Sequence, residues 1–165
     1  MYALATLSGR GVVCSSQRFG CELGVMDVFG DKDCLCSVTF WRHIGNCFPG
    51  QTGIDSKKFL NSLSVFKIYG FKGLIIGSGF EGKYDILRQA NEILPLYANS
   101  LSVFKCLENP VMFFGKLKSL EVPFPQVNFS AESFEDLGSD WILKDLGSSG
   151  GYGIKKKNWK KIQKF

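Results

Sequence analysis

Short, almost wholly apolar segments alternate with helical patterns along the first hundred residues of the chain. Ala3–Leu7, Leu23–Phe29 and Leu74–Ile76 are such segments, and each is followed by a glycine within two residues. Tyr84–Leu94 repeats apolar residues at steps of three and four, the period of a helix that packs one face on a core. Strands that are apolar on both faces are typical of parallel sheets covered on two sides. The sequence therefore predicts an α/β protein with a parallel sheet.

Two further helices are predicted from their apolar spacing and from residues that favour a helix start. Phe59–Ile68 carries apolar residues on one helical face, and Asp55 or Ser56 can cap its amino end. Pro110 suits the first turn of a helix, and the apolar residues after it recur at helical spacing. We expect the extended stretch Val122–Pro125 to follow that helix.

Two stretches have weaker patterns. The Gly, Pro, Asn and Cys content of Cys34–Gly53 predicts loops, with room for one helical turn. Leu96–Ala98, just after Pro95, is expected to form a short strand.

Asp27, Asp31 and Asp33 follow the second apolar segment, and we interpret them as solvated acids of a turn.

The net charge of +5 comes from one end of the chain. Lys155–Phe165 holds six of the 20 basic residues and no acid, so residues 1–154 carry 14 basic and 15 acidic side chains. A nucleic-acid-binding domain would show a basic face instead. No apolar run reaches the ~18–20 residues needed to cross a bilayer, and no basic signal region opens the chain. We expect a cytoplasmic protein with neither a nucleic-acid nor a membrane partner.

The six cysteines are interpreted as reduced, mostly buried thiols, because no export signal accompanies them. His43, the only histidine, lies with Cys34, Cys36 and Cys47 in the pattern C-x-C-x₆-H-x₃-C. This spacing matches no common zinc site, so no metal site is predicted. A single histidine also supports no Ser/His/Asp or Cys/His set, so no catalytic residue is assigned.

A first glycine-rich loop, Gly77–Gly82, joins an apolar strand to a helix and reads G-x-G-x-x-G. In a dinucleotide site, such glycines let a pyrophosphate approach a helix amino end. No acid ends the next strand, however, and Glu81 within the loop would repel a diphosphate. A turn that needs small residues is one alternative reading. The other is a loop that binds a polar substrate through Gly77, Ser78, Gly79 and Glu81.

A second glycine-rich loop, Gly147–Gly153, follows the strand Trp141–Asp145. It lacks the closing Gly-Lys-Ser/Thr of a Walker A loop. Its backbone N–H groups and serine hydroxyls could still wrap phosphate oxygens, with Lys144 as a fixed positive charge beside them. A linker ahead of the lysine-rich end is the alternative.

Trp141–Ile154 resembles the strand and flexible glycine-rich lid of ATP-grasp enzymes. The upstream segment Asn109–Pro125 fits the helix and proline-containing stretch that precede this strand in the family. In residues 1–105, Ser8–Arg10, Asp27–Asp31 and Gly77–Glu81 resemble one branch, the predicted ATP-dependent carboligases. The resemblance implies a Rossmann-like pre-ATP-grasp domain over 1–105, a partial α+β ATP-grasp domain over 106–154 and a basic tail over 155–165.

The resemblance implies that a carboxylate is phosphorylated by ATP with Mg²⁺, and that a nucleophile then displaces the phosphate. Lys144 would contact the α- and β-phosphates. The lid would be formed by Gly147, Ser148, Ser149, Gly150, Gly151 and Gly153.

The sequence departs from the family at three points. The lysine that many members carry at the start of the preceding helix would fall near Asn109-Pro110, where this sequence has none, so one phosphate contact is expected to be missing. Asp145 replaces the proline that usually follows the lysine. The chain also stops eleven residues after Ile154, where the family continues into the half that supplies the Mg²⁺ ligands. We therefore expect a truncated ATP-grasp ligase with little activity by itself, completed by a partner chain or a homo-oligomer that covers the missing half. A non-enzymatic module that binds a ligand or a partner, and a dinucleotide-binding domain using Gly77–Gly82, are the alternatives.

Overall fold

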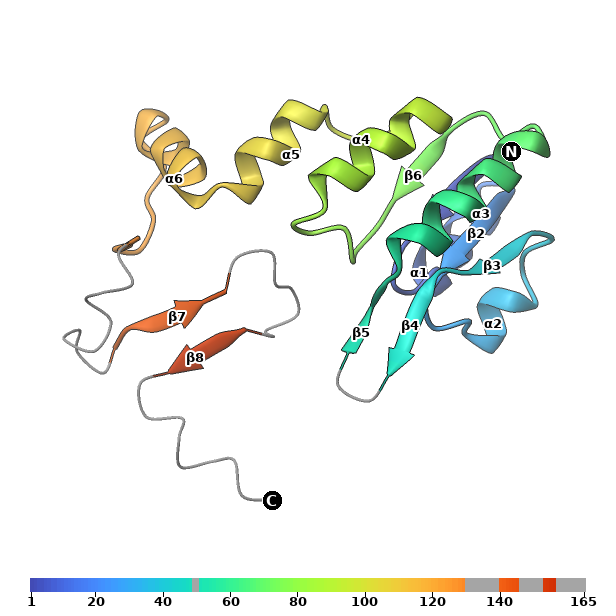
Figure 1. Ribbon diagram of the computed structural model, residues 1–165, viewed down its shortest axis with the longest axis horizontal. Coiled ribbons are helices and arrows are strands. Elements are labelled where there is room, and N and C mark those ends of the chain that lie inside the picture. Colours follow the sequence, from blue (N-terminus) through green and yellow to red (C-terminus); the bar gives the residue numbers. More distant parts are fainter. Residues whose placement is uncertain (49–50, 130–139, 146–152, 157–165) are drawn as a thin grey trace, which may run out of the picture. The chain divides into compact units, whose positions relative to one another are not determined.

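A four-stranded parallel sheet organises the first part of the computed structural model, which describes residues 1–48, 51–129, 140–145 and 153–156. Its strands are β1 (Tyr2–Ala5), β2 (Leu23–Asp27), β3 (Trp41–His43) and β6 (Leu74–Ile76). Their order is β3-β2-β1-β6, and every neighbouring pair is parallel (Figure 1). The predicted α/β class is confirmed.

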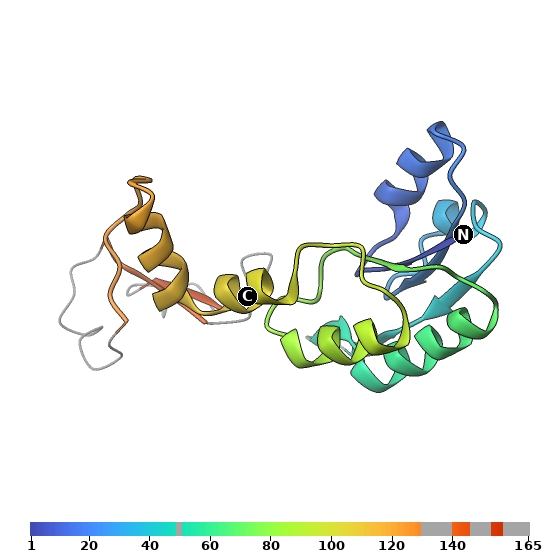
Figure 2. The same ribbon diagram turned by 90° about the horizontal axis from the view of Figure 1, so that it is seen from above.

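Helices cover both faces of this sheet, as the apolar strands require. They are α1 (Arg10–Arg18), α2 (Lys32–Leu35), α3 (Ser56–Ile68) and α4 (Tyr84–Ile93). Helix α1 lies on one face, and α3 and α4 lie side by side on the other (Figure 2). Their buried side chains are Val13 of α1, Phe59, Leu63 and Phe66 of α3, and Leu87 and Ala90 of α4.

Polar side chains cap the first turns of α3 and α6. The Asp55 carboxylate accepts a hydrogen bond of 2.9 Å from the Lys58 backbone N–H, which ties the first turn of α3. The same bond holds the pKa of Asp55 below its ordinary value, because it favours the charged form. In α6 (Pro110–Ser119), the Asn109 side chain accepts a bond of 3.1 Å from the Met112 N–H.

The prediction of loops across Cys34–Gly53 was wrong. The segment contains β3 and most of an antiparallel hairpin, β4 (Gly45–Phe48) with β5 (Gln51–Ile54), in which Gly45 lies opposite Ile54. Strands of three or four residues have too few positions to show an alternating pattern. These strands are fixed by their pairing partners. The prediction of a short strand at Leu96–Ala98 was also wrong, because a single bridge joins Leu96 to Leu74 and the segment forms no strand.

The chain divides into two compact units, Met1–Leu101 and Ser102–Phe165. Helix α5 (Leu101–Glu108), which was not predicted from the sequence, begins at this division. It is followed by α6 and by a hairpin of β7 (Ile142–Lys144) and β8 (Ile154–Lys156). None of the described residues after Leu101 is fully buried. No helix within the described ranges has the length and apolar character needed to cross a membrane.

Candidate functional site

The loops that leave β1 and β6 meet at the carboxyl edge of the sheet. The chain passes from β1 outward to β2 and β3 and then returns to the other side of β1 as β6, so the strand order reverses there. Ligands of open α/β sheets bind at such reversals. The Leu7 N–H donates to the Ser78 carbonyl oxygen at 3.0 Å, and the Thr6 and Ser78 hydroxyl oxygens lie 3.5 Å apart. Ser78 is exposed at this junction.

The glycines of the loop after β6 are needed for packing. A Cβ at Gly77 would lie 2.5 Å from the Thr6 hydroxyl oxygen. Gly79 has a φ of +100°, a conformation that side chains disfavour, and a Cβ there would lie 2.7 Å from Leu7. This geometry accounts for the small residues at both positions without a ligand.

Glu81 folds back onto its own loop. Its carboxylate accepts a hydrogen bond of 2.8 Å from the Gly79 N–H, while the side chain stays exposed. A phosphate at this loop would compete with that carboxylate for the amide and would be repelled by its charge. The geometry thus argues against a dinucleotide at Gly77–Gly82. The exposed Ser78 hydroxyl and Glu81 carboxylate could instead receive a substrate that carries hydrogen-bond donors.

Asp27, at the end of β2, is fully buried, so its interpretation as a solvated turn acid was wrong. Its carboxylate accepts bonds from the Gly9 N–H at 2.9 Å, the Gly30 N–H at 3.1 Å and the Trp41 indole N–H at 2.8 Å. These donors come from the loops after β1 and β2 and from β3. One carboxylate thereby connects the loops after β1 and β2 with strand β3. A buried carboxylate is tolerated there because charge-assisted hydrogen bonds compensate its desolvation.

The two other acids of the turn are more exposed and cross-link the same loops. The Ser8 hydroxyl donates to Asp31 at 2.6 Å, and Arg10 pairs with Asp33 at 2.6 Å. The segments Ser8–Arg10 and Asp27–Asp31, which both carry the resemblance to the carboligases, are therefore neighbours in space.

Cys34 lies beneath these acids and is almost completely buried. Burial raises the pKa of its thiol to about 11, with a further contribution from the negative charges of Asp27, Asp31 and Asp33. The thiol is protonated near neutral pH and is a poor nucleophile there. Among the described side chains, no group of three His, Cys, Asp or Glu residues is arranged to hold a metal ion.

Lys144 ends β7 at the point where the second glycine-rich loop begins. In the β7–β8 hairpin Lys144 lies opposite Ile154, and the Asp145 N–H donates to the Gly153 carbonyl oxygen at 3.0 Å. Lys144 is exposed, and Gly153 has a φ of +77°. Gly147, Ser148, Ser149, Gly150 and Gly151 lie outside the described residues. The Asp145 carboxylate lies 3.9 Å from the Lys155 ammonium group, which offsets part of the negative charge beside Lys144.

Residues 154–156 form a strand although Lys155 and Lys156 were assigned to a basic tail. Residues 157–165 lie outside the described ranges. Consecutive lysines give no strand signal, and only the pairing with β7 defines this strand.

No protein-family model matches the sequence, and no curated protein matches it significantly. Solved structures do match. The biotin carboxylase domain of Hydrogenobacter thermophilus 2-oxoglutarate carboxylase, a dimer solved with MgADP, ADP and bicarbonate, aligns with a TM-score of 0.65 at 13% identity. That alignment covers 93% of this chain and 37% of the matched one.

Two further matches agree with the first. N5-carboxyaminoimidazole ribonucleotide synthetase from Thermus thermophilus has a TM-score of 0.58 at 14% identity, covering 94% of this chain and 40% of its own. Pyruvate carboxylase from Rhizobium etli has a TM-score of 0.56 at 12% identity, covering 94% and 16%. The chain has the fold of the amino-terminal part of such ATP-grasp enzymes, and it spans well under half the length of these relatives.

Proposed function

We propose that this chain supplies the substrate edge and the first nucleotide-binding hairpin of an ATP-dependent carboxylate ligase. The observation that carries the proposal is the position of Lys144 at the mouth of a β-hairpin whose connecting loop is glycine-rich. The ATP-grasp fold supports it, as does the Hydrogenobacter thermophilus domain of that fold, which was solved in complex with MgADP.

The residues present suit a nucleotide's phosphates. Lys144 offers an exposed ammonium group, and the loop offers backbone N–H groups and two serine hydroxyls. In the proposal, Lys144 contacts the α- and β-phosphates, and Gly147, Ser148, Ser149, Gly150, Gly151 and Gly153 close over them. Bound ATP would transfer its γ-phosphoryl group to a carboxylate, giving an acyl phosphate that a nucleophile attacks.

The residues described here do not suit magnesium. Mg²⁺ prefers several oxygen ligands in octahedral geometry, and the described residues hold no cluster of three acidic or other ligating side chains. We therefore assign the Mg²⁺ ligands to polypeptide beyond the described residues and derive no step through the metal.

The carboxyl edge of the first unit is the proposed substrate site. Ser78, Gly79 and Glu81 belong to the loop after β6, directly beside the loop after β1, and Ser78 and Glu81 are exposed. In the proposal, the small carboxylate substrate places hydroxyl or amine donors against Ser78 and Glu81, and Gly77 keeps the two loops in contact.

A covering partner is also part of the proposal. Val103, Leu107, Val111 and Met112 on α5 and α6 are each at least 40% exposed. Apolar surface of this kind is typical of an interface. We propose that further polypeptide, in another chain or a second copy, covers these helices and completes the catalytic domain, so that the 165 residues alone show little ATP turnover.

The test is a titration of the pure chain with a fluorescent ATP analogue and Mg²⁺. We expect weak binding that Lys144→Ala reduces at least about fivefold, because a desolvated phosphate contact with lysine contributes roughly 1 kcal/mol or more. Lys118→Ala, which removes an exposed lysine of α6, is the matched control and should bind like the original chain.

Equal binding by the original chain and Lys144→Ala would overturn the nucleotide assignment and favour a non-enzymatic binding module. Normal enzymatic turnover of ATP by the pure chain would overturn the need for further polypeptide. Heat released on titration with NAD(P) or FAD would instead favour the dinucleotide reading of Gly77–Gly82.

A further inference from the structure

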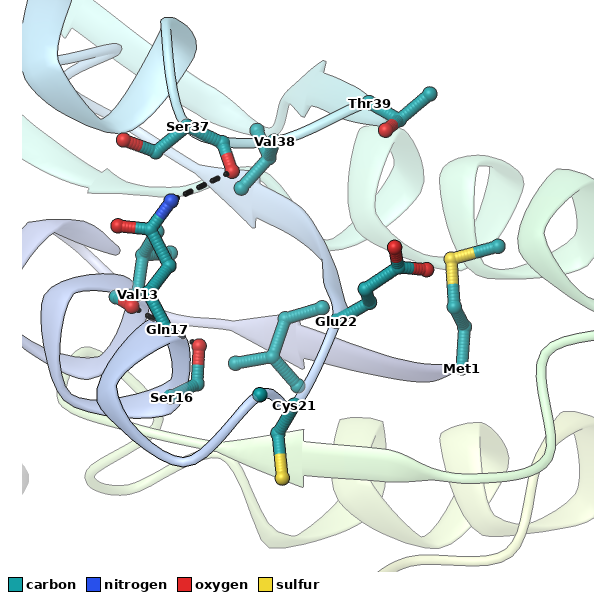
Figure 3. Close-up of a pocket in the computed structure, with 11 residues that line it drawn as sticks. Met1, Val13, Ser16, Gln17, Cys21, Glu22, Ser37, Val38 and Thr39 are labelled. Atoms are coloured by element: carbon teal, nitrogen blue, oxygen red, sulfur yellow. Dashed lines mark hydrogen bonds between the residues drawn. The ribbon is translucent and has the colours of Figure 1, made fainter.

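A hollow of about 410 Å³ lies at the amino edge of the sheet, opposite the proposed substrate site (Figure 3). Its place follows from two of its lining residues, because Met1 immediately precedes β1 and Leu23 is the first residue of β2. The other lining residues come from α1, the turn after it and residues 37–39 ahead of β3, all within the first unit. Cavities of about 300–1,000 Å³ have the size that accepts small molecules.

The end of helix α1 shapes one wall of the hollow. Gly20 has a φ of +65°, which glycine adopts without strain. Its N–H donates to the Gln17 carbonyl oxygen at 3.1 Å, and the Cys21 N–H donates to the Ser16 carbonyl oxygen at 3.0 Å. These two bonds form the Schellman arrangement that ends a helix. The turn thereby brings Glu22 to the hollow together with the last turn of α1.

Hydrogen-bond acceptors predominate among the polar groups that these side chains still offer. The Ser16 hydroxyl donates to the Val13 carbonyl oxygen at 2.9 Å, and the Gln17 amide nitrogen donates to the Ser37 carbonyl oxygen at 3.3 Å (Figure 3). The lone pairs of the Ser16 hydroxyl and the Gln17 Oε1 remain as acceptors. The Glu22 carboxylate adds two further acceptor oxygens. The hollow therefore favours a ligand that is rich in hydrogen-bond donors.

The hollow is negatively charged. Glu22 supplies the charge among the described side chains that line it. It forms no ion pair with the described residues, the amino group of Met1 included. The carboxyl end of α1 adds the negative partial charge of the helix dipole. Arg18, the next residue along α1, is exposed and does not line the hollow. An ammonium group is the donor that suits these charges.

The floor of the hollow is apolar. Val13 is 1% exposed and Leu23 is 9% exposed, and Val38 packs against the same core cluster. A ligand must therefore present hydrocarbon to this floor and donors to the walls. The ring of an amino sugar and the carbon chain of an amino alcohol combine both kinds of group.

We propose that the hollow at the amino edge binds a small hydroxylated amine, of the class of amino sugars and amino alcohols. The ammonium group pairs with Glu22, and hydroxyl groups donate to Ser16 and Gln17. The hydrocarbon face of the ligand lies on Val13 and Leu23. The proposal is independent of the function proposed above, because the residues assigned to that function belong to the carboxyl edge and to the second unit.

An NMR titration of the isotope-labelled full chain with glucosamine tests the proposal. At about pH 6 the amine of glucosamine is protonated, and glucose is the matched sugar with a hydroxyl in its place. We expect saturable shifts of the amide signals of Cys21, Glu22 and Thr39, with a millimolar dissociation constant. Glucose should bind at least about fivefold more weakly, because a charge-assisted hydrogen bond is stronger than a neutral one.

Two variants isolate the carboxylate. Glu22→Gln keeps the shape of the side chain and removes its charge, so it should raise the dissociation constant for glucosamine at least about fivefold. The affinity for glucose should change less than about twofold. Glu22 is exposed, so the fold should tolerate the change, and the amide spectrum checks this. Glu121→Gln, which changes an exposed acid of the second unit, is the matched control and should bind like the original chain.

The same titration also contains the results that would overturn the proposal. Raising the NaCl concentration should weaken glucosamine binding more than glucose binding, because salt screens an exposed ion pair. Absence of saturable shifts up to about 50 mM glucosamine, equal affinities for the two sugars, or equal affinities of Glu22→Gln and the original chain would each overturn it. Shifts confined to Ser78 and Glu81 would overturn it as well, because they would place the amine at the carboxyl edge.

Discussion

Asp27 shows how a single buried residue organises the carboxyl edge. Its three hydrogen bonds connect backbone from two loops with the indole of β3. From the sequence alone, Asp27 was interpreted as one of three solvated acids of a turn. Only the position of β3 beside β2 brings Trp41 to it and excludes water, and β3 was not predicted.

Replacing Asp27 should be costly. Asp27→Ala leaves one buried and two partly buried donors without their acceptor, so we expect a loss of roughly 3 kcal/mol in the free energy of unfolding. Urea denaturation followed by circular dichroism measures it. Asp33→Ala, which removes the half-exposed partner of Arg10, should cost under about 1 kcal/mol. Similar losses in the two variants would contradict the role given to Asp27.

Cys34 should make stability fall at alkaline pH. Its thiol has a pKa of about 11 when folded against an ordinary value of 9.0. The unfolded chain therefore ionises first as pH rises. The stabilisation is fully present below pH 9 and is lost progressively up to about pH 11, at up to about 1.4 kcal/mol per pH unit. Urea denaturation at several pH values measures this slope.

Two variants isolate the contribution of that thiol. Cys34→Ala should have a shallower alkaline slope than the original chain, whatever its absolute stability. Cys36→Ala, which removes an exposed thiol nearby, should keep the original slope. If Cys34→Ala and the original chain lose stability in parallel above pH 9, the slope has another source.

At the scale of elements, the sequence predicted the helices that have a strong local pattern. It did not predict the strands that are defined by pairing with another strand. Helices α3, α4 and α6 occupy the ranges that their apolar spacing and caps indicated. The hairpin β4–β5 and strands β3 and β8 are defined by pairing with a partner strand, and their own sequences resemble loops. Helix α5, which directly precedes α6, was not predicted from the sequence.

The strand–loop–helix unit from β6 to α4 offers a direct test of the role of its glycines. Gly79→Ala should destabilise the first unit by about 1–3 kcal/mol, because a side chain would be strained at φ +100° and would collide with Leu7. Gly11→Ala is the control, since nothing lies within 4 Å of its added Cβ and it lies in α1. That variant should be neutral or slightly stabilising. Thermal unfolding compares them, and equal melting temperatures would contradict the packing argument.

At the scale of the whole molecule, all of the described residues that are buried lie in the first unit. Ala3, Leu4 and Ala5 of the central strand β1 are completely inaccessible to solvent. The described residues of the second unit include none that is fully buried. Local stability follows buried apolar contacts.

Hydrogen exchange should reflect this difference. We expect amides of β1, β2 and α3 to exchange only by global unfolding of the first unit, and amides of α5 and α6 to exchange orders of magnitude faster. Exchange measured by mass spectrometry on the pure chain gives the comparison. Protection of α6 equal to that of β1 would contradict it, and would indicate that α6 is covered in solution.

The sequence by itself determined the fold class, because apolar strands, glycine turns and helical periodicity are local signals with a fixed physical meaning. It also identified Lys144 with its glycine-rich loop, and the loop Gly77–Gly82, by their places after strands. The tertiary structure decided what these residues touch. It placed Glu81 on the amide of Gly79, buried Asp27 beneath three donors and paired Lys144 with Ile154. Such contacts form between residues that are distant in the sequence, or within a loop that folds back on itself. No local sequence pattern indicates them.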